Sequence, residues 1–258
     1  MKMIKIKSSR EIELMREAGK ILGGALNLVA GLVKPGVSTR SLDKTIARYI
    51  IEKGGVPAFK GYRGYPANIC VSVNEEVVHG IPGKRLISEG DIVSVDIGVG
   101  WQNYFTDAAV TVPAGRISAK AQKLIDVTRE SLSLTLGKVK AGARLSEISA
   151  TVQNFVEANG FSVVRDLVGH GVGSALHEPP QIPNYVDKKG LAETNSIILK
   201  EGMTLAIEPM VNEGTFEVET LANNWTVVTK DRKLSAHFEH TVLVRENGRE
   251  ILTEFKYG

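Results

Sequence analysis

An internal duplication is the feature that most constrains how this chain can fold. Residues 33–36 (Val-Lys-Pro-Gly) reappear as residues 139–142 (Val-Lys-Ala-Gly), a shift of 106 residues. Each copy leads into a segment whose apolar residues have helical spacing and which ends at a glycine, Gly54 or Gly160, as expected at a helix C-terminus. The apolar positions are Leu42, Ile46, Tyr49 and Ile50 in the first copy and Ile148, Val152, Phe155 and Val156 in the second.

A second matching pair of segments predicts strands. Residues 86–96 match residues 198–208 at a shift of 112, and in both copies a Glu-Gly turn leads into alternating apolar residues that end in an acid. Helical stretches at about 9–31 and 118–136 precede the paired helices, and Ser8-x-x-Glu11 would cap the first of them.

The duplication therefore predicts two helix-helix-strand-strand halves, at about 9–113 and 118–250. Because no Pro/Gly/Ser-rich linker separates the halves, we expect one domain over residues 1–258 with a pseudo-two-fold centre. We expect an α+β fold in which the strands form one central antiparallel sheet whose outer face the four helices cover.

Composition excludes several classes of protein. A single cysteine, Cys70, excludes an internal disulfide and a cysteine-based metal site, so any metal must bind to histidines and carboxylates. A net charge of +3 with scattered basic residues gives no reason to expect nucleic-acid binding. No apolar run approaches the roughly 20 residues of a membrane span, and the first residues do not resemble a secretory signal, so we expect a cytoplasmic protein.

Two acids lie in neighbouring predicted strands. Asp96 and Asp107 belong to runs at 92–99 and 104–112, and a turn centred on residues 101–102 would place them directly opposite each other. Their Cβ atoms would then lie about 5 Å apart, a pairing that like charges destabilise. A solvated acidic face is one interpretation, and a cation between the two carboxylates is the other.

Two more acids favour the cation. Glu208 is the duplicate of Asp96, and Glu239, in a strand pattern at 234–242, is expected to duplicate Asp107. Four converging carboxylates carry about four negative charges, which two divalent cations would neutralise, and shared carboxylates can hold such ions about 3.5–4 Å apart.

A glycine-rich segment adds imidazoles to these acids. Gly-His170-Gly-Val-Gly precedes His177, and the glycines favour a loop in which the backbone approaches a crowded site. His79 lies in a similar Val-His-Gly-Ile-Pro segment, whereas His240 is expected to pack on the opposite face of its strand. A purely structural histidine is the alternative, but one imidazole among carboxylates suits Mn²⁺, Fe²⁺, Co²⁺ or Zn²⁺.

These acids and histidines, in this order and with these neighbours, resemble the methionine aminopeptidases across the whole chain. The resemblance is to the short bacterial type I form and implies the pita-bread fold. It implies that Asp96 and Asp107 bind one divalent ion, that His170 and Glu208 bind a second, and that Asp107 and Glu239 bridge the two.

The same resemblance implies catalytic and binding roles. Glu208 would accept or relay the proton of a metal-bound water, His177 would contact the scissile amide and stabilise the oxyanion, and His79 would contact the peptide and assist the leaving amine. The methionine pocket is implied at Phe59, Tyr62, Tyr65, Cys70, Leu176 and Trp225, with His79 and His177 at the peptide.

Further partners also follow from the resemblance. Asn74 and Ser235 match positions that hold a monovalent cation, Na⁺ or K⁺, in family members. The implied substrate is a nascent peptide, which implies transient contact with the ribosome, with Lys188 and Lys189 as candidate contacts. Because no long exposed apolar pattern requires a partner, we expect a monomer.

Three other functions fit the same fold. A Xaa-Pro aminopeptidase or prolidase shares the ligand set and differs in substrate. A pita-bread module that binds peptide without catalysis, or a metal-free enzyme such as creatinase, has no need for all five ligands.

Overall fold

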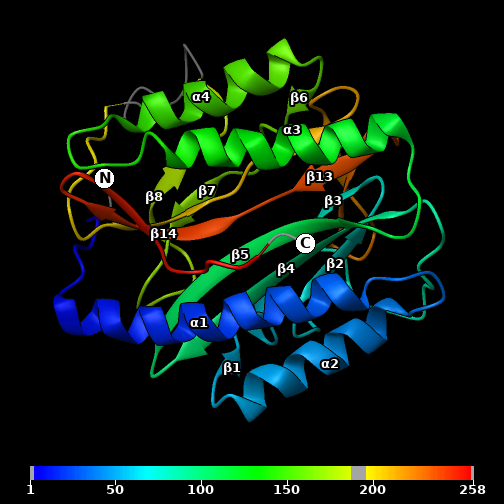
Figure 1. The fold of residues 1–258 in the computed structure, drawn as a ribbon, viewed down its shortest axis with the longest axis horizontal. Helices are drawn as coiled ribbons and strands as arrows, with labels where there is room; N and C mark the ends of the chain where they lie inside the picture. Colours follow the sequence, from blue (N-terminus) through cyan, green and yellow to red (C-terminus); the bar gives the residue numbers. More distant parts are fainter. Residues whose placement is uncertain (1–2, 187–195, 257–258) are drawn as a thin grey trace.

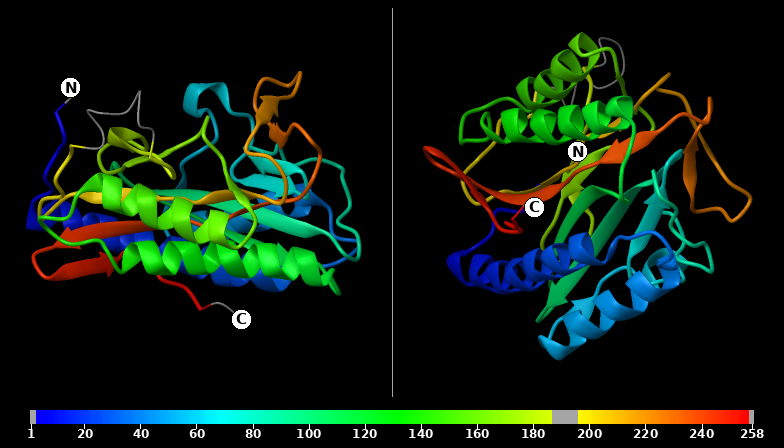
Figure 2. Two further views of the ribbon diagram at one scale, coloured as in Figure 1. Left: turned by 90° about the horizontal axis from the view of Figure 1, so that it is seen from above. Right: turned by 45° about the vertical axis from the view of Figure 1, so that its right-hand side comes forward.

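The computed structural model describes residues 3–186 and 196–256, which form four α-helices, one 3-10 helix (Tyr62–Gly64) and a set of strands. The helices are α1 (Ser9–Leu32), α2 (Thr39–Glu52), α3 (Ala119–Leu136) and α4 (Leu145–Ala158). Figure 1 shows α1 and α2 beside the strands of the first half and α3 and α4 beside those of the second. The helices lie on one side of the strands, and most of the loops lie on the other side (Figure 2).

The duplicated segments adopt the same local structure. The first and last residues of α4 follow those of α2 by 106 positions. The isolated β-bridge between Ser38 and Leu86 recurs between Arg144 and Ile198. The matching glycines all adopt left-handed backbone angles that favour glycine. These pairs are Gly36 and Gly142 (φ 85° and 84°), Gly54 and Gly160 (82° and 84°), and Gly90 and Gly202 (92° and 84°).

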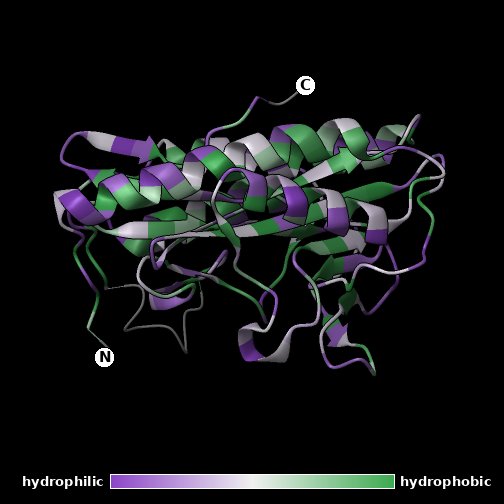
Figure 3. Ribbon diagram, turned by 90° about the horizontal axis from the view of Figure 1, so that it is seen from below, coloured by the Kyte–Doolittle hydropathy of each residue, from purple (hydrophilic) through white to green (hydrophobic). Residues whose placement is uncertain are grey.

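The sequence also predicts how the helices begin. Ser8 and Glu11 form the expected capping box at the start of α1, and Ser38 and Ser118 cap α2 and α3 through their side chains. These caps supply acceptors for backbone N–H groups that a first helical turn leaves unpaired. Figure 3 shows apolar and polar residues alternating along the helices nearest the viewer, as expected for helices with one buried face.

All strand pairs in the described part of the chain are antiparallel, as predicted, but they form four hydrogen-bonded sheets rather than a continuous one. The sheets run β1-β4-β2 with β5 on β4, β13-β10-β6, β11-β12-β3, and β15-β14-β9-β7-β8. The strands are β1 (Val56–Pro57), β2 (Cys70–Val73), β3 (Glu76–Val78), β4 (Ile92–Trp101), β5 (Tyr104–Pro113), β6 (Ser162–Val163), β7 (Gly169–Gly171), β8 (Glu178–Ile182), β9 (Thr204–Ile207), β10 (Met210–Asn212), β11 (Val218–Thr220), β12 (Val227–Thr229), β13 (Ser235–His237), β14 (His240–Arg245) and β15 (Gly248–Ile251).

The predicted register of the β4–β5 hairpin is wrong by two residues. Asp96 lies opposite Ala109, and Asp107 lies opposite Gly98, so the two acids are diagonal rather than direct neighbours. The turn consists of Gln102 and Asn103, both with positive φ (46° and 66°), as a two-residue hairpin requires to match strand twist. Diagonal neighbours remain on one face of the sheet, so the acids still converge.

The two halves meet through the strands that carry the acids. Ala109 and Glu239 exchange backbone hydrogen bonds, with N···O distances of 3.4 and 3.0 Å. The backbone N–H of Asp107 also donates to the hydroxyl of Thr241 at 2.9 Å. The segments that carry the acids of the two halves are thereby hydrogen-bonded directly to each other.

The register at this contact corrects the expected equivalence of Glu239 and Asp107. Met210 pairs with His237, and Ile207 pairs with His240, so the intervening Glu208 falls opposite Glu239. In the first half the counterpart of Glu208, Asp96, faces Ala109. Glu239 therefore occupies the register position of Ala109.

The main core cluster contains residues from both halves. The inward faces of the helices supply Leu22, Ile46 and Ile148, and the strands supply Val95 and Leu205, all of them buried. No helix in the described ranges has the length and apolarity that crossing a membrane would need.

Two glycines of α1 provide a test of how the helix packs. A Cβ at Gly19 would lie 2.0 Å from the backbone oxygen of Leu252, whereas a Cβ at Gly31 would meet nothing within 4 Å. We expect Gly31→Ala to raise the free energy of unfolding by up to about 1 kcal/mol through helix propensity. Gly19→Ala should lower it by about 1–3 kcal/mol because the helix must shift.

Urea unfolding followed by circular dichroism measures both changes, and Gly31→Ala serves as the control for the intrinsic effect of the substitution. Equal stabilisation by the two variants would contradict the close packing of α1 on the C-terminal segment.

Candidate functional site

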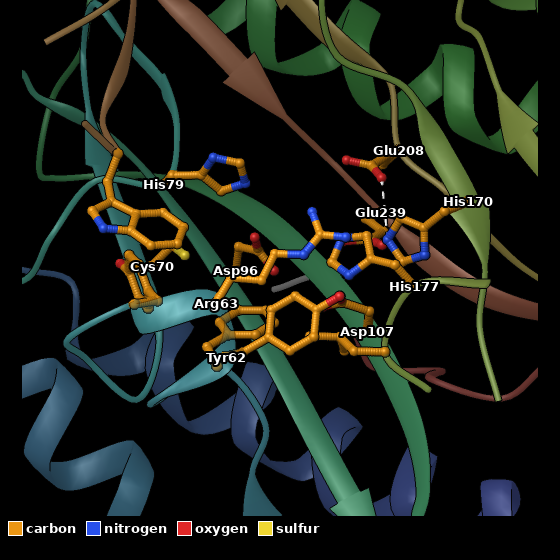
Figure 4. Close-up of a pocket in the computed structure, with 14 residues that line it drawn as sticks. Tyr62, Arg63, Cys70, His79, Asp96, Asp107, His170, His177, Glu208 and Glu239 are labelled. Carbon is orange, nitrogen blue, oxygen red and sulfur yellow. Dashed lines mark ion pairs between the residues drawn. The ribbon is translucent and has the colours of Figure 1, made fainter. Parts of the chain in front are cut away.

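One pocket, with an empty volume of about 620 Å³, gathers the residues that the sequence analysis singled out. Figure 4 shows Asp107, His170, His177, Glu208 and Glu239 grouped on one side of the pocket and Cys70 and His79 on the other. Its lining residues are Phe59, Tyr62, Arg63, Tyr65, Cys70, His79, Asp96, Asp107, His170, Leu176, His177, Glu208, Trp225 and Glu239. Every residue assigned above to divalent metal binding, catalysis or the methionine pocket is among them.

The carboxylates project from strands or from breaks between strands. Asp96 and Asp107 lie within β4 and β5, whereas Glu208 follows β9 and Glu239 precedes β14. Ligand atoms of Asp107, His170 and Glu239 lie within 4.8 Å of one another, close enough for a single metal ion. The Nε2 atom of His170 also lies 3.6 Å from a carboxylate oxygen of Glu208.

His170 lies on a strand, β7, and not in the expected loop. Its Nδ1 atom is 2.9 Å from the carbonyl oxygen of Gly171, which leaves Nε2 facing the carboxylates. A Cβ at Gly169 would lie 2.5 Å from the oxygen of Ala206, and one at Gly171 would lie 2.2 Å from that of Pro179. The glycines therefore let β7 fit between its neighbouring strands, which puts the imidazole at the acids.

Burial raises the pKa of all four carboxyl groups. The pKa of Asp96 rises to about 6 and that of Glu208 to about 7, while burial and the neighbouring acids raise those of Asp107 and Glu239 well above their usual range. One oxygen each of Asp96, Asp107 and Glu239 is buried without a hydrogen-bond donor. Such oxygens need protons or a cation.

The donor set fits divalent metal ions. Four carboxylates offer hard oxygen ligands, and His170 adds one imidazole nitrogen. This combination suits ions such as Mn²⁺, Fe²⁺, Co²⁺ or Zn²⁺, and cations would satisfy the unpartnered oxygens that the protein itself leaves. The residues present therefore form a buried candidate metal site.

Two further imidazoles border the acids. The ring of His177 stacks on that of Tyr62, with centroids 5.2 Å apart, and its centroid lies 4.1 Å from that of His170. The ring of His79 meets that of Trp225 edge-on, with centroids 6.4 Å apart. Burial lowers the pKa of His79 to about 4. Partial desolvation in the pocket, with positive charge on neighbouring groups, lowers the pKa of His177 to about 3, although the residue keeps an exposed edge. Both rings are therefore neutral near pH 7, and each can donate one N–H and accept one hydrogen bond.

The apolar wall is a hydrophobic cluster separate from the main core. Phe59, Tyr65, Cys70 and Leu176 are buried in it, and Trp225 packs against it. The hydroxyl of Tyr65 donates to the carbonyl oxygen of Gly80 at 2.9 Å, which fixes the ring. Cys70 lies opposite Asp96 in the β2–β4 ladder, and burial raises the pKa of its thiol, so it presents a neutral sulfur to the pocket.

Two residues near the acids were not predicted from sequence. Arg63 lines the pocket with its guanidinium 5.3 Å from the ring of Tyr62, and no spacing argument singles it out. His237 is buried with Nε2 3.6 Å from Glu208. It precedes Glu239 by two positions on the same strand pattern, so strand alternation could have placed it on the acid face.

The remaining predicted residues lie outside this pocket. His240 packs as expected, with Nδ1 3.0 Å from the hydroxyl of Thr253. The backbone N–H of Ser235 donates to the carbonyl oxygen of Asn74 at 2.8 Å, so these two residues are neighbours. Lys188 and Lys189 lie outside the described residues.

Comparison with known proteins agrees with this geometry. The model of metallopeptidase family M24 matches residues 13–246. Methionine aminopeptidase 1 of Bacillus subtilis is 52% identical over 252 residues, covering 97% of this chain and 99% of the relative. The methionine aminopeptidase of Escherichia coli is 47% identical, covering 97% of this chain and 94% of its own length.

Solved structures extend the comparison to the fold. The methionine aminopeptidase of Thermotoga maritima superposes with a TM-score of 0.94 at 47% identity, covering 98% of this chain and all of that chain. Prolidase from Pyrococcus furiosus reaches a TM-score of 0.76 at 21% identity and shares the fold alone. The expected pita-bread fold is thus confirmed, and the chain belongs to metallopeptidase family M24 and, within it, to the type I methionine aminopeptidases.

Proposed function

We propose that this chain removes the initiator methionine from new polypeptides, when the second residue is small, by two-metal hydrolysis. The observation that carries the proposal is a single pocket in which buried, unpartnered carboxylates face an apolar aromatic wall. An unbranched thioether gains favourable contacts against rings such as Tyr65 and Trp225. The acids then lie where the adjoining peptide bond would be.

We assign the metal ligands as the resemblance implies. Asp107 and Glu239 would be shared by two divalent ions, Asp96 would complete one site, and His170 and Glu208 would complete the other. Ions bound here would lower the pKa of a shared water so that hydroxide forms near neutral pH. Mn²⁺, Fe²⁺, Co²⁺ and Zn²⁺ all suit this donor set.

Three side chains would act on the substrate and its protons. Glu208 accepts or relays the proton of the attacking water. His177, neutral at pH 7, donates its N–H to the oxygen of the scissile carbonyl as negative charge develops there. His79 contacts the peptide and assists the leaving amine.

The surroundings of the site are assigned more coarsely. We propose a monovalent cation, Na⁺ or K⁺, near Asn74 and Ser235, where the backbone N–H of Ser235 donates to the carbonyl oxygen of Asn74 at 2.8 Å. We also treat residues 1–258 as one domain, because one core cluster draws on both halves. A monomer in the cytoplasm that contacts the ribosome transiently fits a nascent-peptide substrate.

Turnover of two tripeptides separates this function from its nearest enzymatic rival. We expect Met-Ala-Ser to release free methionine with added Mn²⁺ or Co²⁺, a chelator to stop the reaction, and Ala-Pro-Ala to resist cleavage. Chromatography of the products measures all three outcomes. Cleavage of Ala-Pro-Ala alone would instead support a Xaa-Pro peptidase, and elemental analysis without bound metal would support a peptide-binding module.

Substitution of the central carboxylate should have opposite effects on activity and stability. Asp107→Asn removes a bridging charge, so turnover should be abolished. Burial and the neighbouring acids raise the pKa of Asp107, so keeping this carboxyl group buried costs stability at any pH above the pKa of the unfolded chain. In chelator-treated protein at pH 8 the neutral amide removes that cost, so the free energy of unfolding should rise by about 0.5–2 kcal/mol. A variant that keeps near-normal turnover, or that is less stable than the metal-free wild type, would contradict the metal assignment.

The oxyanion role of His177 predicts an effect mainly on kcat. His177→Ala should lower kcat about 10²-fold or more with a much smaller change in KM, because the donor acts chiefly in the transition state. His177→Asn keeps an N–H donor and should lose less. Equal losses in the two variants would argue against donation from this position.

A further inference from the structure

A buried ion pair joins the N-terminal segment to the turn that carries His177. The Nζ atom of Lys7 lies 2.7 Å from Oε2 of Glu178, and both side chains are only 3% exposed. Their positions in the sequence differ by 171 residues. Lys5 also approaches Glu178, at 3.7 Å, but its side chain is 58% exposed, so its contribution is screened by water.

The second oxygen of Glu178 closes the turn. Oε1 accepts hydrogen bonds from the hydroxyl of Ser174 at 3.0 Å and from the backbone N–H of Ala175 at 3.2 Å. Leu176 and His177 lie between these donors and Glu178, the first residue of β8. One carboxylate therefore ties both ends of the segment that presents His177 to the pocket.

The backbone around the pair leaves room for Lys7. A Cβ at Gly173 would lie 2.4 Å from Cε of Lys7, so only glycine lets the lysine pass there unmoved. The backbone N–H of Lys7 donates to the oxygen of Gly202 at 2.8 Å, and that of Phe105 donates to the oxygen of Gly173 at 2.8 Å. The third glycine of the Gly-His-Gly-Val-Gly motif thus serves this contact.

The ring of His177 depends on its backbone for its position. In the described part of the chain it makes ring contacts with Tyr62 and His170, and no side-chain hydrogen bond orients it. Stacking alone lets the imidazole move parallel to the Tyr62 ring, so the backbone of the turn must determine how far the His177 side chain reaches into the pocket. A displacement of about 1 Å at such a group can reduce a rate by about 10²-fold.

A buried ion pair by itself adds little net stability to a fold. Desolvation of two charges often cancels their attraction, and apolar replacements of similar size can be equally stable, whereas removing one partner leaves an uncompensated charge. We propose that Lys7 and Glu178 are positioning residues. The carboxylate of Glu178, which Lys7 neutralises and holds in place, fixes the turn at 174–178 through its hydrogen bonds and thereby directs His177 at the scissile peptide bond. The catalytic part of this inference rests on the role proposed above for His177.

Four variants separate positioning from stability. Lys7→Met and Glu178→Gln each leave one buried charge unpaired, so each should lower kcat for Met-Ala-Ser by about ten- to a hundredfold. The double variant Lys7→Met/Glu178→Gln buries no charge and keeps an amide oxygen that accepts from Ser174 and Ala175, so kcat should return to within about threefold of wild type.

The second double variant, Lys7→Met/Glu178→Leu, is the decisive one. Its apolar pair should match or exceed the Tm of Lys7→Met/Glu178→Gln, but kcat should stay at least about tenfold low because leucine accepts no hydrogen bond. Arg16→Met is the control: it breaks the pair between Arg16 and Glu250 (2.6 Å), neither of which belongs to the turn, and should lower Tm without changing kcat.

An NMR readout keeps the test independent of turnover. The ring signals of His177 should shift in both single variants and in the leucine double variant, but not in the glutamine double variant or in Arg16→Met. Full recovery of kcat and of the His177 signals in Lys7→Met/Glu178→Leu would overturn the proposal and leave the pair a purely structural contact. Wild-type protein that releases no methionine, with the NMR pattern as expected, would refute the proposed function and not the positioning of His177.

Discussion

Repulsion among buried carboxylates is the constraint on which the site depends. Asp96, Asp107, Glu208 and Glu239 meet where the two halves join, and burial raises the pKa of each. One oxygen each of Asp96, Asp107 and Glu239 has no hydrogen-bond donor among the described residues. These groups do not cluster for the sake of stability, because buried like charges destabilise a fold. Divalent cations would convert the same cluster from a destabilising group into a binding site. The core on either side must therefore supply the stability that the centre lacks.

The division of the molecule into a helical face and a loop face explains how it meets this requirement. The helices bury apolar residues such as Leu22 and Ile148 against the strands, in a cluster shared by both halves. The pocket wall of Phe59, Tyr65 and Leu176 forms a separate cluster on loops, so its shape can vary without disturbing the main core. Catalytic groups on a rigid sheet and specificity groups on loops are a common arrangement among enzymes.

Local sequence signals predicted the elements accurately because short-range physics controls them. The helical spacing, the Ser8 cap and the glycines that end the helices act within a few residues. The structure places α1 and α3 within a residue of the expected bounds and ends α2 and α4 two residues before Gly54 and Gly160. The hairpin register failed because the turn is fixed by the positive φ of Gln102 and Asn103, which apolar alternation does not reveal. The error was two residues, which preserves the face of a strand, so the predicted convergence of Asp96 and Asp107 survived.

The sequence by itself determined the duplication, the helices, the family and the set of acids and histidines, since repeats, periodicity and residue order are properties of the chain alone. Only the tertiary structure decided which positions meet. It hydrogen-bonded Glu239 to Ala109 where the two halves meet, and it brought His237 next to Glu208. It also placed Arg63 in the pocket and paired Lys7 with Glu178, which is distant in sequence. Contacts between distant segments depend on how helices and strands pack, and no local pattern encodes that packing.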